Sequence, residues 1–366
     1  MRVLHLLASG GYGGIESLMR SYGKESKLEN IFVFVWGTGD IYGDMCNQGM
    51  NCVDLKEKNG KFLHTVKAII RKCNEMKPDV VVTHHDVAQF KAVLMYLRIF
   101  NPKIKTIAYA HENGADIAKN GNKLKSFVTK KINELGFHSA DGVVAISKSV
   151  QKSIEVIFKV PKEKIKVIYN GTDTKKIHPR VRKKIDDGAR LLYVGRLIEE
   201  KGVQTTIAAL ATLPISLKWT FDIVGDGPYR EILERQVKDA DLSEKVHFCG
   251  SCNNVPEILN NHDIFIHMPN WEEGFGITVV EAMAAGLVCI CFRKGGIPEI
   301  IENGSDGILV DSKGELTKTL EKLMTSGFEE KIYTISEAAL IKAKKFSIER
   351  FTSELDLYIN EVYARI

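Results

Sequence analysis

The 366-residue sequence lacks the features that would assign it to a specialised class of protein. No apolar run approaches the ~20 residues that span a bilayer, and the longest apolar segment, 277–292, is interrupted by Glu281 and Gly286. Internal repeats and low-complexity segments are absent. The composition, 44% hydrophobic and 27% charged, is ordinary for a soluble globular protein. Because a domain takes about 100–200 residues, we expect two.

Cysteine is scarce and follows no pattern, with seven residues at unrelated spacings. In a long chain, such an odd number predicts a reducing compartment. Cys249 and Cys252 have the spacing of half a zinc site, but no second pair follows, so we expect two buried side chains and no structural metal. The apolar residues 3–8 lead directly into glycines, which indicates a buried strand and not a secretory signal. We therefore expect a cytoplasmic protein.

Positive charge is concentrated in the first half of the chain. Residues 1–175 carry 27 Lys and Arg against 17 Asp and Glu, whereas the remaining 191 residues carry 24 against 29. This asymmetry suggests that two domains bind different partners. The basic residues show neither aromatic interleaving nor a nucleic-acid motif, so we expect no nucleic-acid partner.

Short apolar runs alternate with segments of helical periodicity in both halves. Alternation of this kind predicts βαβ units, hence an α/β protein with two doubly wound parallel-sheet domains. The expected strands are 3–8, 31–36, 80–83, 105–110, 143–146, 166–169, 191–194, 221–224, 246–249, 264–267, 288–292 and 308–310. We place the first domain at 1–172, a linker at 173–189, the second domain at 190–346 and a final helix at 347–366 that packs on the first domain. Ligands of such sheets bind beyond the carboxyl ends of the strands.

A glycine-rich segment, GGYGGIE at 10–16, follows the first expected strand and opens a helix. Glycines allow close backbone approach, and a helix N-terminus attracts phosphate, so Gly13 and Gly14 are candidate ligand-binding residues. Two other interpretations stay open, packing glycines and a dinucleotide site. The dinucleotide fingerprint requires G-x-G-x-x-G and an acid about 20 residues later, whereas this chain has G-G-x-G-G and a late Asp40.

Two charged clusters follow strands of the second half. Arg196 and Lys201 suit a pyrophosphate, although two solvated surface cations are the alternative. Glu273 and Glu281 lie eight residues apart in the segment PNWEEGFGITVVEAMAAG. If a helix begins near Gly276, Glu273 precedes its N-terminus and Glu281 projects from its second turn. There the glycine N–H groups can meet an anion, and a carboxylate can accept paired hydroxyl hydrogen bonds.

Six motifs follow one another from about residue 8 to residue 310. They are Gly-Gly-Ile-Glu near the start, YNGTD at 169–173, VGRL with EKG at 194–202, VGDGP at 224–228, the pair Glu273 and Glu281 within the segment above, and GGIPE at 295–299. The ordered set resembles the retaining glycosyltransferases of family four. This resemblance implies the GT-B fold, in which two Rossmann-like domains face a cleft.

The resemblance implies roles for residues of the second half. Arg196 and Lys201 would bind the diphosphate of a nucleotide-sugar donor. Glu273 matches the residue that contacts the donor sugar, and Glu281 the residue that holds the ribose hydroxyls. The N–H groups expected to approach the sugar or phosphate are those of Gly274, Phe275 and Gly276.

In the first half, the resemblance makes Gly13 and Gly14 donor-binding residues. His111 follows a strand where the family has a histidine near the donor sugar, although a structural histidine is the alternative. We therefore expect four catalytic residues, namely His111, Arg196, Lys201 and Glu273.

The reaction implied is a retaining transfer of a hexose or N-acetylhexosamine from a nucleotide-sugar, UDP before GDP, with neither metal nor cofactor. The acceptor would be a glycan or a lipid-linked glycan, in bacterial surface-polysaccharide or glycolipid synthesis. A donor phosphate oxygen can take the acceptor's proton, which leaves positioning and charge stabilisation to the protein. An epimerase of the same fold and an inactive nucleotide-sugar-binding protein remain alternatives.

Two departures from the family pattern concern fine donor positioning. Pro269 is followed by Asn270 where the family has Pro-Ser, and Leu287 follows Gly286 where the family has proline. Neither change removes a functional group. The one D-x-D sequence, at 239–241, falls at an expected helix end and suggests no metal site.

Residues 119–135 combine five lysines with apolar residues at helical spacing. Lys119 to Lys131 have no acid between them. Such a helix can lie on an anionic membrane, so we expect the protein to bind peripherally to the inner face of the cell membrane. The alternative is a helix packed on its sheet with a solvated basic face.

Overall fold

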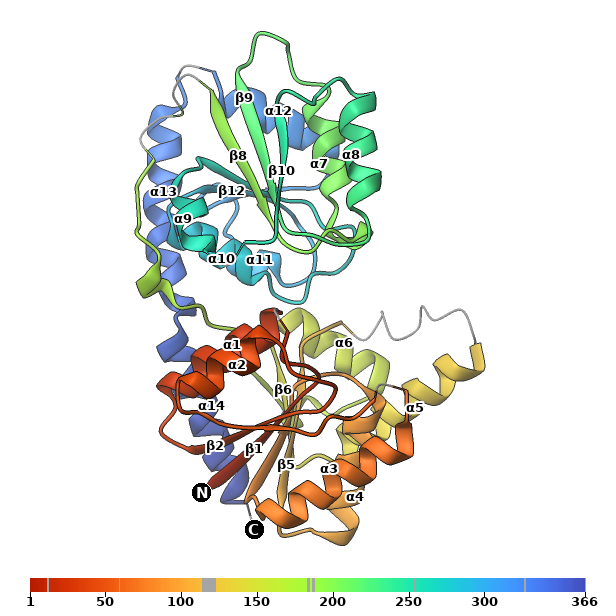
Figure 1. The fold of residues 1–366 in the computed structure, drawn as a ribbon. Coiled ribbons are helices and arrows are strands. Elements are labelled where there is room, and N and C mark those ends of the chain that lie inside the picture. The colour runs from red at the N-terminus through yellow and green to blue at the C-terminus, as the bar shows by residue number, and fades with distance from the viewer. Residues whose placement is uncertain are drawn as a thin grey trace. The chain divides into compact units, whose positions relative to one another are not determined.

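The computed structural model describes residues 1–11, 13–58, 60–113, 123–182, 185, 188–252, 254–325 and 327–365. It forms two compact units (Figure 1). Unit 1 comprises Met1–Gly171 and Ile348–Ile366, and unit 2 comprises Thr172–Ser347.

Unit 1 is built on a seven-stranded parallel sheet with the order β3-β2-β1-β4-β5-β6-β7. Its strands are β1 Arg2–Leu7, β2 Glu29–Phe34, β3 Asn51–Asp54, β4 Val80–Thr83, β5 Lys105–Ala110, β6 Gly142–Ala145 and β7 Ile165–Val167. Its helices are α1 Gly14–Glu25, α2 Asp40–Asn47, α3 Phe62–Met76, α4 Ala88–Phe100, α5 Lys123–Ser139, α6 Lys148–Phe158 and α14 Ile348–Tyr363. Helices α1 and α14 pack together on one face of the sheet, and α3, α4 and α5 lie on the other (Figure 1).

Unit 2 is built on a six-stranded parallel sheet with the order β10-β9-β8-β11-β12-β13. Its strands are β8 Ala189–Val194, β9 Trp219–Val224, β10 Val246–Gly250, β11 Ile264–His267, β12 Val288–Phe292 and β13 Ile308–Val310. Its helices are α7 Val203–Leu210, α8 Arg230–Asp239, α9 Val255–Asn260, α10 Ile277–Ala284, α11 Ile297–Ile300, α12 Lys313–Leu323 and α13 Glu329–Ala343. Short 3-10 turns occupy Thr174–Lys176, Glu199–Lys201 and Lys344–Phe346.

Both sheets reverse their strand order at one point, between β1 and β4 in unit 1 and between β8 and β11 in unit 2. At such a point the connections leave toward opposite faces of the sheet, which opens a crevice at the carboxyl ends of the two strands. The predicted fold class is confirmed by these two Rossmann-like sheets. Strand order thus brings residues that follow β8 and β11 to one edge.

The structure departs from the sequence prediction at two features. Strand β3 was not predicted, because it is a four-residue edge strand with polar ends and no fully buried side chain. The expected burial of Cys249 and Cys252 is wrong, since Cys249 is exposed and Cys252 is half-buried. Cys249 lies near the end of β10 and Cys252 follows that strand, whose carboxyl end is only partly buried.

A buried arginine anchors the first segment of unit 2. The Arg182 side chain is 2% exposed, and burial lowers its pKa to about 10, so the guanidinium stays charged at neutral pH. The group donates to the backbone carbonyl oxygens of Arg180, Leu259, Asn260, His262 and Ala285. Helix C-termini carry unpaired carbonyls and partial negative charge. Arg182 therefore joins the ends of α9 and α10, and fixes the helix that carries Glu281.

We predict that Arg182→Ala destabilises the protein strongly. The change removes the guanidinium that these carbonyls share, at about 1–3 kcal/mol for each one left without a donor, so the melting temperature should fall by about 6 °C or more. Circular dichroism measures the transition. Arg180→Ala, which removes a neighbouring exposed guanidinium, is the control, and equal melting temperatures for the two variants would contradict the assignment.

Candidate functional site

The carboxyl ends of β8 and β11 bring the cations and the first acid of the predicted motifs together. Lys201 ends the 3-10 turn after β8, and Glu273 lies in the loop after β11. The Lys201 Nζ atom lies 2.7 Å from the Glu273 Oε2 atom. These two side chains, 72 residues apart in the sequence, are therefore one feature of the site.

Two further donors reach the same carboxylate oxygen. His267 Nε2 lies 3.1 Å and Trp271 Nε1 lies 3.4 Å from Glu273 Oε2. Burial alone would raise the pKa of Glu273, but the Lys201 charge and the His267 hydrogen bond hold it well below its usual range. The carboxylate therefore stays ionised at neutral pH.

His267 and Trp271 were not predicted as site residues from the sequence. His267 is the last residue of an otherwise apolar strand, and a polar residue at that position was the available signal. Trp271 lies two residues before Glu273, and Lys201 Nζ lies 5.2 Å from the centre of its ring. The His267 and Trp271 side chains therefore limit the movement of the Lys201 and Glu273 side chains.

The loop that carries Glu273 is hydrogen-bonded to a second glycine-rich segment. The Gly295 N–H donates to Glu272 Oε2 at 2.6 Å, and the Gly296 N–H donates to the Glu273 carbonyl at 2.7 Å. A Cβ atom on Gly295, where φ is +58°, would lie 2.1 Å from that carbonyl. The segment GGIPE thus holds the position of the Glu273 backbone.

Helix α10 begins directly after this loop. Its N-cap, Gly276, has a φ of +100°, which a glycine adopts without strain. Phe275 is buried, and its ring contacts that of Phe346 edge-on with 5.5 Å between ring centres. Gly274 completes the turn, and α10 directs its unpaired N–H groups back toward the loop.

Glu281 lies in the second turn of α10, as predicted from its spacing. It is half-buried, and its Oε1 atom accepts a hydrogen bond of 3.2 Å from the Thr172 hydroxyl. Burial raises the pKa of the Glu281 carboxyl to about 7, and the Thr172 contact opposes this only weakly. Glu281 is a partly neutral acid near pH 7, unlike Glu273.

Arg196 follows β8 and is exposed. Within the described ranges of the chain, its guanidinium has no hydrogen-bond or ion-pair partner. Its backbone is fixed by the Gly195 N–H, which donates to Val224, and the Leu197 N–H, which donates to Asp226. This side chain therefore presents a charge that an anionic ligand can pair.

In unit 1, the predicted glycines lie at the start of α1. Gly13 is the N-cap, and a Cβ atom there would lie 2.2 Å from Glu16 Oε2. Glu16 is buried, with Oε1 at 3.4 Å from His85 Nε2. Gly14 is the exposed first residue of the helix.

His111 follows β5 and is 8% exposed. Its ring stacks on Tyr109 with 4.5 Å between ring centres, and the centre of the His84 ring lies 5.9 Å away. Burial, together with the charges of His85 and Lys91, holds the pKa of His111 well below its usual range. His84 follows β4 and was not predicted as a site residue; its Nε2 atom lies 2.9 Å from His5 Nδ1.

The basic helix is partly described. Residues 119–122 lie outside the described residues. In the rest of α5, Phe127 is 66% exposed, and Lys130 and Lys131 are exposed beside it. Lys131 pairs with Glu134 at 3.0 Å.

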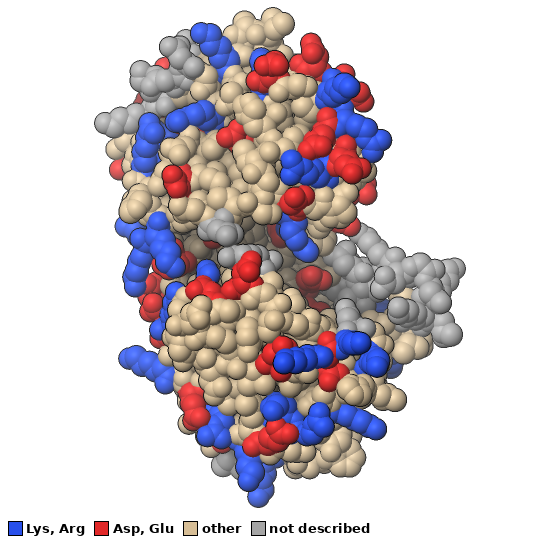
Figure 2. Space-filling view, in the orientation of Figure 1, with Lys and Arg blue, Asp and Glu red and all other residues tan. Residues whose placement is uncertain are grey.

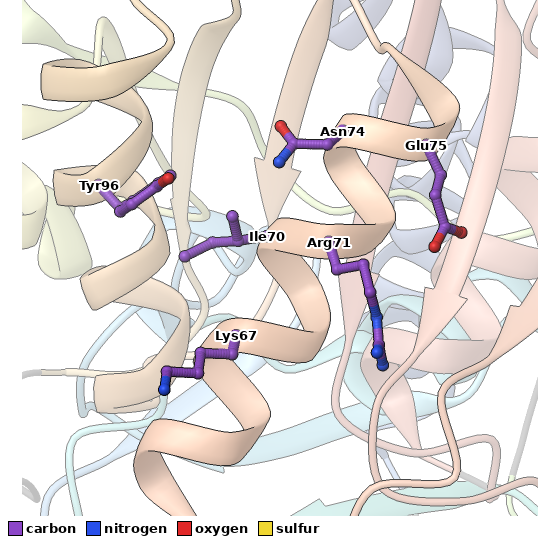
Figure 3. Close-up of a pocket in the computed structure, with 6 residues that line it drawn as sticks. All are labelled: Lys67, Ile70, Arg71, Asn74, Glu75 and Tyr96. Carbon is purple, nitrogen blue, oxygen red and sulfur yellow. The ribbon is translucent and has the colours of Figure 1, made fainter.

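A surface pocket of about 540 Å³ lies between α3 and α4 (Figure 3). Its lining residues are Lys67, Ile70, Arg71, Asn74, Glu75 and Tyr96. None of the predicted site residues is among them.

We predict that Glu281 gives the protein a pH-dependent stability. A carboxyl with a pKa of about 7 in the folded chain and 4.5 ordinarily binds more protons when folded between those values, so the free energy of unfolding falls as the pH rises through that window. Glu281→Gln should remove this component, on the order of 2 kcal/mol after allowance for partial exposure. Urea unfolding of both proteins from pH 4.5 to 8 measures it, and parallel pH profiles would contradict it.

Two family models match the chain. Glycosyltransferase Family 4 matches residues 49–176, and Glycosyl transferases group 1 matches residues 173–342. The uncharacterized glycosyltransferase MJ1069 of Methanocaldococcus jannaschii is 31% identical over 253 residues, which are 65% of this chain and 64% of that relative. The N-acetyl-alpha-D-glucosaminyl L-malate synthase of Bacillus anthracis is 25% identical over 75% of this chain and 71% of its own length. The match with MJ1069 thus spans less than two thirds of that relative.

Solved structures share the fold. Anabaena HepE, in complex with UDP-glucose, has a TM-score of 0.83 and 21% identity, with 99% of this chain and 100% of that chain covered. A glycosyltransferase from Rickettsia africae has a TM-score of 0.82 and 18% identity, with 100% and 99% covered. These structures show that the chain has the GT-B fold, and the two family models, which together span residues 49–342, establish that it belongs to the GT4-type glycosyltransferases.

Proposed function

We propose that the protein is a retaining, metal-independent glycosyltransferase that moves a hexose or an N-acetylhexosamine from a nucleotide-sugar to a glycan or lipid-linked acceptor. UDP is the first choice of nucleotide and GDP the second. The observation that carries the proposal is the convergence of Lys201, Glu273 and the start of α10 at one sheet edge. Anabaena HepE, which has the same fold, has been solved with UDP-glucose, which supports a UDP-sugar.

Each charged residue has a task in this proposal. Arg196 and Lys201 pair the diphosphate, and Glu281 accepts from the ribose hydroxyls. Glu273 accepts from a hydroxyl of the donor sugar. The N–H groups of Gly274, Phe275 and Gly276 approach the sugar or the phosphate.

The reaction then needs no side-chain base. The bond from the anomeric carbon to the phosphate oxygen breaks, and the acceptor oxygen bonds to that carbon on the same face. The acceptor proton passes to a phosphate oxygen. The protein contributes position and fixed positive charge beside the departing diphosphate, which are the largest sources of catalysis in such sites. His111 and the Gly13–Gly14 turn are further candidate donor contacts in unit 1.

A thermal-shift panel of UDP, GDP, ADP and NAD tests the proposal. At about 1 mM, a nucleotide bound with an affinity of about 10 µM adds about 2.7 kcal/mol to the folded state. Stabilisation by UDP or GDP supports a nucleotide-sugar site and selects the donors to assay. Stabilisation by NAD alone contradicts it. Donor conversion without acceptor would identify an epimerase, and binding without any turnover an inactive protein.

We predict that Arg196→Ala lowers kcat by about 10²- to 10³-fold, because it removes a fixed charge from the departing diphosphate. Nucleotide release from the best donor measures the rate. Arg235→Ala, which removes an exposed guanidinium of α8, is the matched control. Equal rates in the two variants would show that Arg196 lies outside the site.

We also propose that residues 119–135 bind the anionic inner face of the cell membrane. The protein would there act in bacterial surface-polysaccharide or glycolipid synthesis. In the described part of α5, exposed Phe127 and Val128 lie beside Lys130 and Lys131, a combination typical of interfacial helices. Among the described residues, no helix is long and apolar enough to cross a membrane. On the face drawn in Figure 2, the coloured basic and acidic side chains are interspersed.

We predict flotation with phosphatidylglycerol vesicles at low salt. Phe127→Ser combined with Lys130→Gln should reduce the floated fraction, because apolar and charged contacts are both removed. Val156→Ser, which changes an exposed residue of α6, is the control. Absence of wild-type flotation would exclude the membrane partner.

A further inference from the structure

Glu273 uses only one of its two carboxylate oxygens for contacts within the protein. Lys201, His267 and Trp271 all reach Oε2, at 2.7, 3.1 and 3.4 Å. No hydrogen bond reaches Oε1 from any part of the chain that the structure describes. Three donors on one oxygen restrict rotation of the carboxylate and leave the other oxygen as an acceptor.

His267 is the most constrained of the three donors. It is 2% exposed, and its ring lies nearly parallel to those of Tyr193 and Phe265, with 6.3 and 6.4 Å between ring centres. With Nε2 donating to Glu273, a neutral ring has an accepting Nδ1 atom. That Nδ1 atom is buried and finds no partner within the described ranges.

An unpaired buried nitrogen is a cost to the fold. An apolar aromatic ring at position 267 would pack between the same neighbours and would leave no buried nitrogen unpaired. The need for a core side chain therefore does not account for the histidine, whereas its hydrogen bond to Glu273 does.

We propose that His267 is a positioning residue that, with Lys201 and Trp271, fixes Oε2 of Glu273 so that Oε1 accepts a hydrogen bond from a hydroxyl of the donor sugar. The inference rests on the proposed function for the identity of the ligand. His267 itself touches no substrate. It acts by holding the carboxylate in the orientation that a bound sugar requires.

Kinetics of two substitutions test this role. His267→Phe removes the donor, and kcat/KM for the nucleotide-sugar should fall about tenfold or more. The affinity for UDP alone and the melting temperature should remain those of the wild type. His267→Gln places an amide N–H near the position of Nε2 and should restore most of the activity. His262→Gln, at another buried histidine of unit 2, is the control. Wild-type kcat/KM in His267→Phe, or an equal loss in His267→Gln, would overturn the proposal.

A second measurement is independent of turnover. The ¹⁵N spectrum of the His267 ring should show a protonated Nε2 whose shift changes in Glu273→Gln. An unprotonated Nε2 would overturn the inference even in an active enzyme. If the spectrum is as expected but the wild type neither binds UDP or GDP nor releases nucleotide, the proposed function fails while the contact stands.

Discussion

The ion pair between Lys201 and Glu273 is the interaction on which the site of unit 2 depends. It joins the connection after β8 to the connection after β11, and the backbone brings these two segments into contact. The Asn270 N–H donates to the Glu200 carbonyl at 2.8 Å, and a Cβ atom on Gly202 would lie 1.7 Å from the Met268 carbonyl. A side chain at position 202 would therefore push Lys201 away from the carboxylate.

The two acids of the site differ because their surroundings differ. Glu273 faces a lysine and a histidine, which keep it ionised despite burial. Among the described residues, the Thr172 hydroxyl is the one hydrogen-bond partner of the Glu281 carboxylate, so burial dominates and raises its pKa to about 7. The ionised Glu273 carboxylate can only accept hydrogen bonds. Glu281, which is partly neutral near pH 7, can accept a hydrogen bond from a hydroxyl group or donate one to it. Arg182 donates to the Ala285 carbonyl and so fixes the C-terminal end of α10, the helix that carries Glu281.

The sequence predicted the two sheets and the start of α10, because buried parallel strands are continuous apolar runs and Gly276 marks the helix boundary. It did not predict β3, an edge strand with little burial. It also did not predict which groups meet. Lys201 is predicted to bind phosphate, and the structure adds Glu273 as a partner that the sequence did not indicate. Contacts between residues 72 and 109 apart, Lys201–Glu273 and Thr172–Glu281, depend on strand order and not on local pattern.

Hydrogen exchange of the full chain with and without UDP is the most direct test of the nucleotide site in unit 2, because it locates the bound nucleotide without a known acceptor. We predict protection at residues 195–202 and 273–281, where the connections after β8 and β11 carry the charged residues and the start of α10. Protection confined to residues 8–16 of unit 1, or no protection at saturating UDP, would contradict it.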